Sequence, residues 1–518
     1  MHDERAAKSP YLPQTTQHAG QRLIHRPVAI ACVLSDCKMQ CHVKASNGTS
    51  VALSGMHSLD SSIVMSIESN TPDEPETIVV IGNGMVGLRF CERLVEYDLN
   101  RRYRIVTFCE EPRAAYDRVG LTSFFAHRDA EKLMLARREW YERVGIKLHL
   151  GDRACTIDRD CKTVVSSRGV EIAYDRIVMA TGSYPLVPPI PGIRKKGVFV
   201  YRTIEDLQHI IQYAEHSKAC AVIGGGLLGL EAAKAAFDLD LETHVIEFAS
   251  RLMPRQVDDA GSETLVRKIE ELGVHVHLSS GVQEVYGDRK VERIKFTTGE
   301  SIDCEMIIVS AGIRPRDELA QECGLALGEH GGIQVNDRLQ TSDSDIFAIG
   351  ECTFHNGMIY GLMAPGWEMA EIVAANLCGE DRRFGGTDVS RKLKLMGVDV
   401  ASFGDYETSD ETVCSTVFSD PVAGTYRRLV FSKDGNHLVG GILIGDAADY
   451  GTLLSYVRSQ EALPCSAGDL TAGSAGGATA VGTDMLPDSG QVCSSSNFSG
   501  TVPQHGEVSR GNRISARR

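Results

Sequence analysis

Two stretches of the chain repeat one pattern of apolar and polar positions. Residues 78–81 are all apolar, as in a parallel strand buried on both faces, and they run into the glycine turn GNGMVG at 82–87. After this turn the apolar spacing becomes helical. Residues 221–223 and the turn GGGLLG at 224–229 repeat the arrangement. The pattern predicts two strand, turn and helix units of the kind that opens a dinucleotide-binding α/β fold.

The glycines of such a turn have separate tasks. Gly82 takes the backbone angles of the tight turn, Gly84 leaves room for a pyrophosphate, and Gly87 lets the helix pack closely on the strand. The phosphates then face the N-terminus of the helix. The predicted cofactor contacts are Gly82, Asn83, Gly84, Met85, Val86 and Gly87 in the first turn, and Gly224, Gly226, Leu227, Leu228 and Gly229 in the second.

An acidic residue ends the strand that follows each turn. The strand at 103–109 leads into Glu110 and Glu111, and the strand at 243–246 leads into Glu247, close to the expected distance of roughly twenty residues. Each carboxylate is predicted to hold an adenosine ribose. For the first turn we favour Glu110, with Glu111 as the alternative. A turn that only packs, without a ligand, is a reasonable alternative for one such motif but not for two.

Composition narrows the class of protein. A chain of 518 residues exceeds what one core can use, so several domains are expected. The net charge of -15 disfavours nucleic-acid or anionic-membrane partners, and no run of about 18 apolar residues could span a bilayer. The fifteen cysteines form no C-x-x-C pair, so neither a zinc site nor a disulfide framework is expected. A reducing, cytoplasmic setting fits best.

Further landmarks are Ala180-Thr181-Gly182, after an apolar strand, and TSDSDIFAIGEC at 341–352. With the two glycine turns, they resemble the two-dinucleotide-binding flavoprotein disulfide-reductase superfamily, in which an FAD domain is interrupted by a similarly folded NAD domain. The resemblance implies that Glu351 stands where most relatives use Asp to hold the flavin ribitol, and that Gly350 approaches the flavin phosphate. It implies further cofactor contacts from Arg118, Ala180, Thr181, Gly182 and Gly312.

The resemblance covers about residues 77–456 and implies an α/β fold class, with two Rossmann-like dinucleotide-binding domains and a small α+β C-terminal domain. The alternation of short apolar runs and turn residues near the C-terminal end indicates antiparallel strands. The expected segments are a disordered extension at 1–75, the FAD domain at 76–192 and 313–388, the NAD(P)H domain at 193–312, the small domain at 389–456, and a low-complexity tail at 457–518.

Within the superfamily, the chain is most similar to the N-terminal flavoprotein part of the large subunit of assimilatory NAD(P)H nitrite reductases. The phrases that carry this resemblance are FCEEPRAAYDRVGLTS, MATGSYPLVPPIPG and KLKLMGVDV. Relatives that reduce ferredoxins usually carry a lysine near the flavin N5, where this chain has Ser123. The resemblance leaves Glu231, the usual partner of that lysine, free to meet the nicotinamide. The alternative for Glu231 is an ordinary solvated carboxylate on a helix.

The tail contains MLPDSGQVCSSSNFSG, which resembles the opening of the [2Fe-2S] module of the nitrite reductases. That module begins with C-x-C, whereas this chain has Cys493 followed by Ser495 and no later cysteine. An iron-sulfur cluster needs four thiolate-type ligands, so neither a cluster nor sirohaem is expected here. We therefore expect a natural fragment, a divergent paralogue or a truncated gene model, without a basis for choosing among them.

The chemistry follows from the cofactors. A reduced nicotinamide gives a hydride, a flavin accepts two electrons and can release them singly, and the protein stacks the rings and excludes water. We predict an FAD-dependent NAD(P)H oxidoreductase, a diaphorase, that prefers NADH to NADPH and passes electrons to an unidentified acceptor, such as a separate haem or iron-sulfur protein. A homodimer is one option. A disulfide relay is disfavoured, because only Cys91 and Cys109 lie between Gly87 and Gly151.

Two other functions stay open. The chain could be a stand-alone NADH:ferredoxin or rubredoxin-type reductase, or a non-catalytic subunit that binds flavin and nucleotide and docks a partner. Flavin bleaching by NADH would distinguish an enzyme from a binding subunit.

Overall fold

The computed structural model describes residues 43–44, 50–51 and 74–473, apart from 389 and 409. Two units are separated at Asp73 and Glu74. Within the first unit, β1 (Val43–Lys44) pairs antiparallel with β2 (Ser50–Val51). Most of the extension at 1–75 that was expected to be disordered, and most of the predicted tail, therefore lie outside the described residues. All further elements belong to the second unit.

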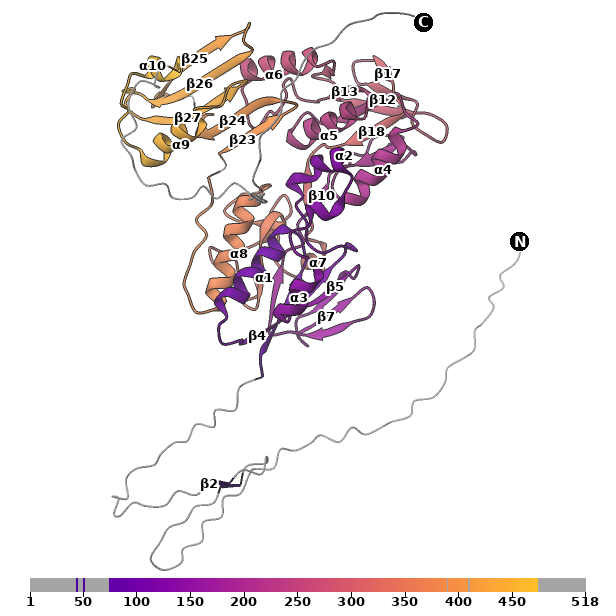
Figure 1. Ribbon diagram of the computed structural model, residues 1–518, viewed down its shortest axis with the longest axis vertical. Coiled ribbons are helices and arrows are strands. Elements are labelled where there is room, and N and C mark those ends of the chain that lie inside the picture. The colour runs from indigo at the N-terminus through magenta and orange to yellow at the C-terminus, as the bar shows by residue number, and fades with distance from the viewer. Residues whose placement is uncertain (1–42, 45–49, 52–73, 389, 409, 474–518) are drawn as a thin grey trace, which may run out of the picture. The chain divides into compact units, whose positions relative to one another are not determined.

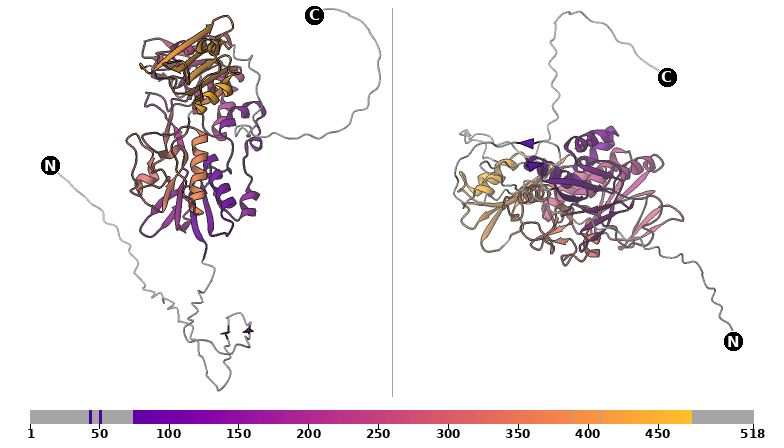
Figure 2. Two further views of the ribbon diagram at one scale, coloured as in Figure 1. Left: turned by 90° about the vertical axis from the view of Figure 1, so that its left-hand side faces the viewer. Right: turned by 90° about the horizontal axis from the view of Figure 1, so that it is seen from below.

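The first parallel sheet is assembled from two distant parts of the chain. Its five strands lie in the order β21-β9-β3-β4-β5, and every pairing is parallel. Helix α1 (Met85–Tyr97) follows β3, and α8 (Met363–Leu377) packs against α1, as the indigo and orange helices show in Figure 2. The strands are β3 (Glu76–Ile81), β4 (Tyr103–Cys109), β5 (Lys147–Leu150), β9 (Arg176–Met179) and β21 (Ile346–Ala348).

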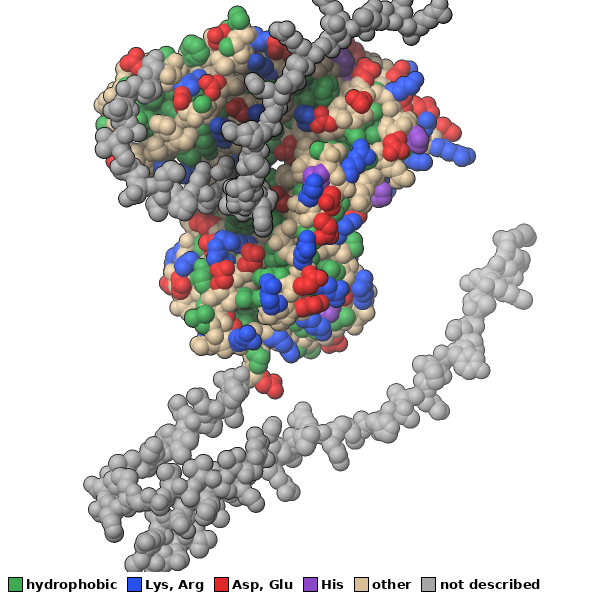
Figure 3. Space-filling view, in the orientation of Figure 1, with side chains coloured by type: hydrophobic (Ala, Val, Ile, Leu, Met, Phe, Trp, Pro, Cys, Tyr) green, Lys and Arg blue, Asp and Glu red, His purple; other side chains and the backbone are tan. Residues whose placement is uncertain are grey.

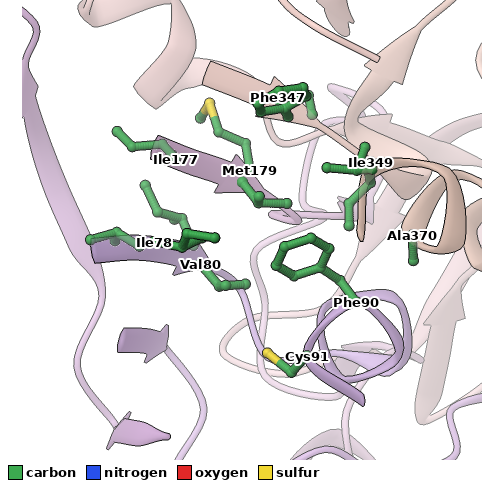
Figure 4. Packing of buried hydrophobic residues seen from close by; sticks show 14 of the residues in the cluster. Ile78, Val80, Phe90, Cys91, Ile177, Met179, Phe347, Ile349 and Ala370 are labelled. Atoms are coloured by element: carbon green, nitrogen blue, oxygen red, sulfur yellow. The ribbon is translucent and has the colours of Figure 1, made fainter. Parts of the chain in front are cut away.

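The core of this domain is built from the apolar run that opens the first motif. Ile78 and Val80 on β3 and Ile177 on the neighbouring β9 are fully buried. In Figure 4 the ring of Phe90 on α1 points toward the strands that carry Val80 and Met179. Because both faces of β3 are covered, its residues 78–81 are all apolar, which is why the sequence shows a run rather than an alternation.

The second parallel sheet repeats the first. Its order is β11-β18-β12-β13-β14, again with parallel pairings throughout. Side chains of β12 alternate between two apolar cores, with Val222 on the side of the helices and Ala221 on the side of a three-stranded antiparallel sheet. The elements are β11 (Val198–Val200), α4 (Ile204–Ala214), β12 (Ala219–Ile223), α5 (Leu227–Asp238), β13 (Glu242–Ile246), α6 (Asp259–Glu271), β14 (His275–His277), β15 (Val282–Tyr286), β16 (Arg293–Phe296), β17 (Ser301–Asp303) and β18 (Met306–Val309).

The chain passes between the two parallel-sheet domains twice. The outward strand β10 (Ser183–Pro185) pairs antiparallel with the returning strand β19 (Ile313–Pro315). The crossings therefore lie beside each other, as expected for one domain inserted into another. The remaining elements of the first domain are η1 (Val119–Ser123), α2 (Phe124–His127), η2 (Ala130–Leu133), α3 (Arg138–Val144), β6 (Ala154–Asp158), β7 (Thr163–Ser166), β8 (Glu171–Ala173), α7 (Glu318–Glu322), β20 (Ile333–Gln334), η3 (Gly350–Cys352) and β22 (Thr353–Phe354).

The small C-terminal domain is an antiparallel sheet in the order β23-β24-β27-β26-β25, labelled in Figure 1. It contacts the second parallel-sheet domain, where Tyr426 donates a hydrogen bond to Asp258, the N-cap of α6, at 2.6 Å. With it, the predicted fold class of two Rossmann-like domains and a small α+β domain is confirmed. Its elements are β23 (Arg391–Leu395), β24 (Val398–Gly404), β25 (Val413–Asp420), β26 (Thr425–Ser432), β27 (Leu438–Ile444), α9 (Tyr450–Ser459) and α10 (Ala467–Thr471).

The small domain continues beyond the boundary expected at residue 456. Helix α10 begins at the N-cap Ser466, whose hydroxyl accepts from the Asp469 amide, and it buries Leu470 against the antiparallel sheet. The Gly- and Ala-rich composition of this stretch favoured a linker over a helix in the sequence analysis. The signal was the pairing of Ser466 with Asp469, a capping pattern three residues apart.

Candidate functional site

In the first glycine turn, two of the three glycines are tightly packed and one faces open space. Gly82 has a φ of 111°, and a Cβ there would overlap the carbonyl oxygen of Ala180. A Cβ at Gly87 would overlap the carbonyl oxygen of Gly82. A Cβ at Gly84, in contrast, would have no neighbour within 4 Å. Gly82 and Gly87 are thus required for packing, whereas Gly84 leaves open the space that a pyrophosphate needs.

The second glycine turn repeats this division of roles. Gly224 has a φ of 116° and faces the carbonyl of Ser310, and Gly229 faces the carbonyl of Gly224 without room for a side chain. A Cβ at Gly226 would have no neighbour within 4 Å. The two predicted turns therefore form two cradles of the same shape, one on each parallel sheet.

Both cradles end at the N-terminus of a helix that is capped by glycine. Gly84 is the N-cap of α1 and Gly226 that of α5. Among the described residues no side chain caps either helix, and neither helix has an acidic residue in its first turn. The first backbone N–H groups and the positive end of each helix dipole are thus left for an anionic ligand.

Asn83 adds an unpaired buried donor to the first cradle. Its side chain is 5% exposed, and its Oδ1 accepts a hydrogen bond from the Tyr141 hydroxyl at 3.1 Å. Its Nδ2 is buried and has no partner among the described residues. A buried N–H without a partner costs about 1–3 kcal/mol, so this amide is a group that a bound ligand would satisfy.

The carboxylate of Glu247 lies directly on the second turn. Its Oε2 accepts from the Gly225 amide at 2.6 Å and its Oε1 from the Ala249 amide at 2.8 Å. These hydrogen bonds fix the side chain beside the open position at Gly226, where the ribose nearest the pyrophosphate would lie.

The end of β4, the strand after the first glycine turn, differs from the end of β13, the strand after the second turn. The Gly82 amide donates to Phe108 and the Gly224 amide to Ile246, so Phe108 corresponds to Ile246 and Cys109, rather than Glu110, corresponds to Glu247. Burial, the largest cause, raises the pKa of the Cys109 thiol to about 11 although a hydrogen bond with the Asn83 backbone lowers it. The thiol is therefore a neutral side chain at this turn.

Glu110 and Glu111 lie one and two residues further along, each in an ion pair. Glu110 pairs with Arg316, whereas Glu111 pairs with Arg118 and accepts a hydrogen bond from the Tyr116 hydroxyl at 2.7 Å. The choice of Glu110 over Glu111 for the ribose remains a prediction.

The end of β21 lies beside the first turn. Gly350 has a φ of 81° and faces the side chain of Val86, so the third landmark of the sequence meets the first. The Glu351 carboxylate next to it accepts from the Ser183 hydroxyl at 2.7 Å and from the Arg202 guanidinium at 2.6 Å. The structure thus gathers residues more than 260 positions apart around one cradle.

Further residues connect the elements around this cradle. The Arg118 guanidinium donates to the carbonyl of Arg202 at 3.1 Å, and the Arg118 amide contacts the sulfur of Met85 at 3.4 Å. The Thr181 hydroxyl donates to the carbonyl of Arg316 at 2.6 Å. The amide of Arg316 donates to the carbonyl of Gly182, and the amide of Leu186 to that of Gly312.

The sequence reasoning missed Arg202, the cation that holds Glu351, and Ser183 beside it. Ser183 follows Gly182 in a phrase quoted for the family resemblance, and Arg202 directly precedes Thr203, the N-cap of the capping box of α4. No local pattern marks an arginine whose partner lies far along the chain.

Glu231 is a carboxylate without a cation. It projects from α5, which packs against η1, the segment that ends at Ser123. Burial alone raises the pKa of Glu231 to about 7, and no hydrogen bond or ion pair satisfies it within the described part of the chain. Ser123 instead donates to the carbonyl of Gly120 at 2.7 Å and lies 3.2 Å from Nε2 of His127.

Comparisons with known proteins agree with the geometry. The family model described as pyridine nucleotide-disulphide oxidoreductase matches residues 76–372, the stretch that holds both cradles and the Gly350-Glu351 landmark. The chain belongs to this family. A second model, described as the C-terminal domain of rubredoxin NAD+ reductase, matches residues 390–461. Membership confirms the enzyme class predicted from the sequence, an FAD-dependent NAD(P)H oxidoreductase.

Relatives with established names fall in the same family. The NADH nitrite reductase large subunit of Escherichia coli (strain K12) is 48% identical over 80% of this chain and 50% of the relative. The NADH oxidase of Methanocaldococcus jannaschii is 33% identical over 64% of this chain and 74% of the relative. The solved NAD-dependent persulfide reductase of A. fulgidus shares 26% identity with a TM-score of 0.67, covering 74% of this chain and 77% of that one.

The sequence resemblance to the nitrite reductase large subunits is thereby confirmed. The chain spans about half the length of the E. coli relative. The FAD and NAD(P)H that family members bind fit the two cradles, because each offers an open second glycine at an uncapped helix N-terminus.

The charges on the surface and the lengths of the helices can be compared with those of nucleic-acid-binding and membrane-spanning proteins. On the face drawn in Figure 3, acidic and basic side chains are interspersed and no basic area stands out. None of the helices in the described residues has both the length and the apolar character that crossing a membrane requires.

Proposed function

We propose that this chain is the electron-input unit of a nitrite reductase-like system. It binds FAD in the first cradle and NADH in the second, takes a hydride from NADH, and passes the electrons to an acceptor held by another protein. The observation that carries the proposal is the pair of equal cradles, of which only the first is joined by Gly350 and Glu351. The identity to the E. coli nitrite reductase large subunit supports the choice of system.

The residues divide the work of binding and orientation. FAD supplies the chemistry of accepting two electrons and releasing them singly. Gly84 and the N-terminus of α1 would receive its pyrophosphate, Glu351 would accept from its ribitol hydroxyls, and the Asn83 amide would gain its missing partner. Arg202 forms an ion pair with Glu351 and so restricts the position of its carboxylate beside the cradle.

Ser123 stands where ferredoxin-reducing relatives usually carry a lysine, and Glu231 is the usual partner of that lysine. Since Glu231 has no cation, its carboxylate is free to face the nicotinamide on the α5 side. It orients the ring rather than transferring a proton, because hydride transfer needs no acid or base from the protein.

The second cradle favours NADH over NADPH. Glu247 is held at the turn by two backbone amides and would accept from the ribose 2′-hydroxyl. A 2′-phosphate at the same place would meet a carboxylate. We expect NADPH to be used with lower efficiency.

The proposal does not include nitrite reduction by this sequence itself. The described cysteines are free thiols, and Cys493, the residue that resembles a cluster ligand, lies outside the described residues. We propose that the chain holds neither an iron-sulfur cluster nor sirohaem, that it works in the cytoplasm, and that a separate protein receives the electrons. A homodimer is consistent with this arrangement but has no residue-level support.

A stand-alone NADH:rubredoxin-type reductase is the second candidate. The small domain favours it, because residues 390–461 match the C-terminal domain of rubredoxin NAD+ reductase and the Pseudomonas putida rubredoxin-NAD(+) reductase is 30% identical over 80% of its length. Position 123 disfavours this second candidate, because it holds a serine where ferredoxin-reducing relatives usually carry a lysine.

The testing experiment is an anaerobic titration of the purified yellow protein with NADH. Bleaching of the flavin absorbance with one equivalent of NADH supports the enzyme, and unbleached colour supports the non-catalytic binding subunit. The reduced protein is then mixed with ferricyanide, ferredoxin, rubredoxin, or nitrite. Dye reduction without ammonium formation is expected. Ammonium from nitrite, or rubredoxin as the fastest acceptor, would contradict the proposal.

A further inference from the structure

Three histidines and one glutamate gather at one edge of the second sheet, on the edge strand β14 and its neighbour β13. His244 on β13 is the register partner of His275 on β14, and Ile246 is the partner of His277. Because side chains alternate along a strand, Glu242, His244, His275 and His277 all lie on one face. This is the face of Phe296, whose ring lies 5.2 Å from that of His277.

The ligand atoms of Glu242, His244 and His275 converge. Nε2 of His244 lies 3.5 Å from Oε1 of Glu242, and Nε2 of His275 lies 3.8 Å from the same oxygen. One ligand atom of each residue lies within 4.8 Å of the other two. In a tetrahedral zinc site with bonds near 2.0–2.1 Å, ligand atoms stand about 3.3 Å apart, so only small side-chain movements are needed.

The burial of the three residues suits such a movement. His244 is 8% exposed and is held between the rings of His275 and His277. The side chains of Glu242 and His275 are 62% and 55% exposed. One ligand is thus fixed, while the other two are free to close on an ion and leave a coordination position open to water.

His277 would support the site from behind. Its Nε2 lies 3.1 Å from Nδ1 of His244, on the side of the ring opposite to Glu242. A histidine that binds metal through Nε2 usually donates its Nδ1–H to an acceptor, and this contact supplies one.

We propose that Glu242, His244 and His275 bind one Zn²⁺ ion, with His277 orienting His244. Two imidazoles and a carboxylate form a ligand set typical of zinc, whereas Mg²⁺ and Ca²⁺ prefer oxygen ligands. The ion would join the edge strand β14 to β13. The site would also lie close to Glu247, the proposed ribose-binding residue, because the His277 carbonyl accepts a hydrogen bond from the Glu247 amide at 2.8 Å.

The test is Zn²⁺ binding by the untagged, full-length protein after removal of metal with a chelator. A chromophoric zinc indicator competes for the ion and gives stoichiometry and affinity, and Co²⁺ as a second probe reports the ligand geometry through its visible absorption. The exposed His275 is the first position to change, because His275→Ala leaves the buried part of the fold intact. His216→Ala, an exposed histidine at the end of α4, is the matched control.

We expect His275→Ala to bind one fewer tight equivalent of Zn²⁺ and to lose the Co²⁺ absorption of the site, and His216→Ala to retain both. Glu242→Gln should weaken binding, and His277→Ala should weaken it about 10- to 100-fold. Histidines of the first 73 residues can bind metal too, so the difference between variants is decisive rather than the total. Equal stoichiometry and affinity in wild type and His275→Ala, or no tight equivalent in wild type, would overturn the proposal. Neither readout depends on flavin or NADH.

Discussion

Replacing Glu247 by Gln should relax the preference for NADH. In the wild type, the carboxylate accepts from the amides of Gly225 and Ala249. In the proposed binding mode it would also face the 2′-position of the ribose, where NADPH carries a phosphate. Arg251 on the same loop pairs with Asp259 at 2.9 Å, so its charge is already partly offset. Gln removes the charge and keeps one acceptor oxygen, while its NH2 group replaces the second oxygen that accepts from a backbone amide.

The magnitude follows from the charges. Two unit charges about 4 Å apart repel by roughly 4 kcal/mol at an effective dielectric near 20. Two backbone amides already stabilise the carboxylate and solvent reaches the rim of the turn, so part of this repulsion is screened. If about a third remains, the discrimination is about 1.4 kcal/mol, or tenfold.

The assay is ferricyanide reduction with NADH and with NADPH, compared as kcat/KM. We expect the wild type to favour NADH about tenfold or more, and Glu247→Gln to bring the ratio near one, mainly through better use of NADPH. Glu263→Gln, an exposed glutamate on α6 of the same domain, is the control and should keep the wild-type ratio. An unchanged ratio in Glu247→Gln would mean that this carboxylate does not face the 2′-position.

Other positions give independent checks. Gly84→Val should abolish FAD binding, since the side chain fills the open space of the first cradle, whereas Gly385→Val at an exposed, open position should remain yellow; retained colour in the first variant would refute the placement. Burial raises the pKa of Glu231 from 4.5 to about 7, so the folded state holds a proton that the unfolded state has lost, and stability should fall by up to about 3 kcal/mol as pH rises from 4.5 to 7. Denaturant unfolding of Glu231→Gln should therefore show less of this fall and exceed wild type most above pH 7; a difference independent of pH would count against it. Leu470→Ala should cost about 2–5 kcal/mol in unfolding of the small domain, because Leu470 is 2% exposed, while Val422→Ala should cost almost nothing; equal effects would place α10 outside the fold.

The sequence was sufficient for the features that are local. The strand before Gly82, the turn itself and the helix after it are set within about twenty residues, and the second copy at Gly224 made the interpretation firm. The glycine roles also follow from local geometry, because a positive φ and a missing Cβ are properties of single positions.

The features that the sequence could not show depend on contacts between distant segments. Arg202 meets Glu351 only after β10 and β19 have brought the two crossings together. The histidine cluster likewise forms from the pairing of β13 with β14, which are separated by the whole of α6. Neither spacing resembles a metal or cofactor motif when the chain is read in order.

The two cradles differ most where the sequence made them look alike. Both have the same glycines, but the strand end of the second carries Glu247 and that of the first carries the neutral Cys109, with Glu110 and Glu111 displaced along the loop into ion pairs with Arg316 and Arg118. Two backbone amides already hold the Glu247 carboxylate in place, which suits a nucleotide that binds and leaves during each turnover. For a cofactor that stays bound we propose contacts from several segments, with Asn83 and Glu351 among them. We therefore infer that the fold uses one backbone motif for two binding tasks, and that the side chains at the strand ends set which nucleotide is exchanged.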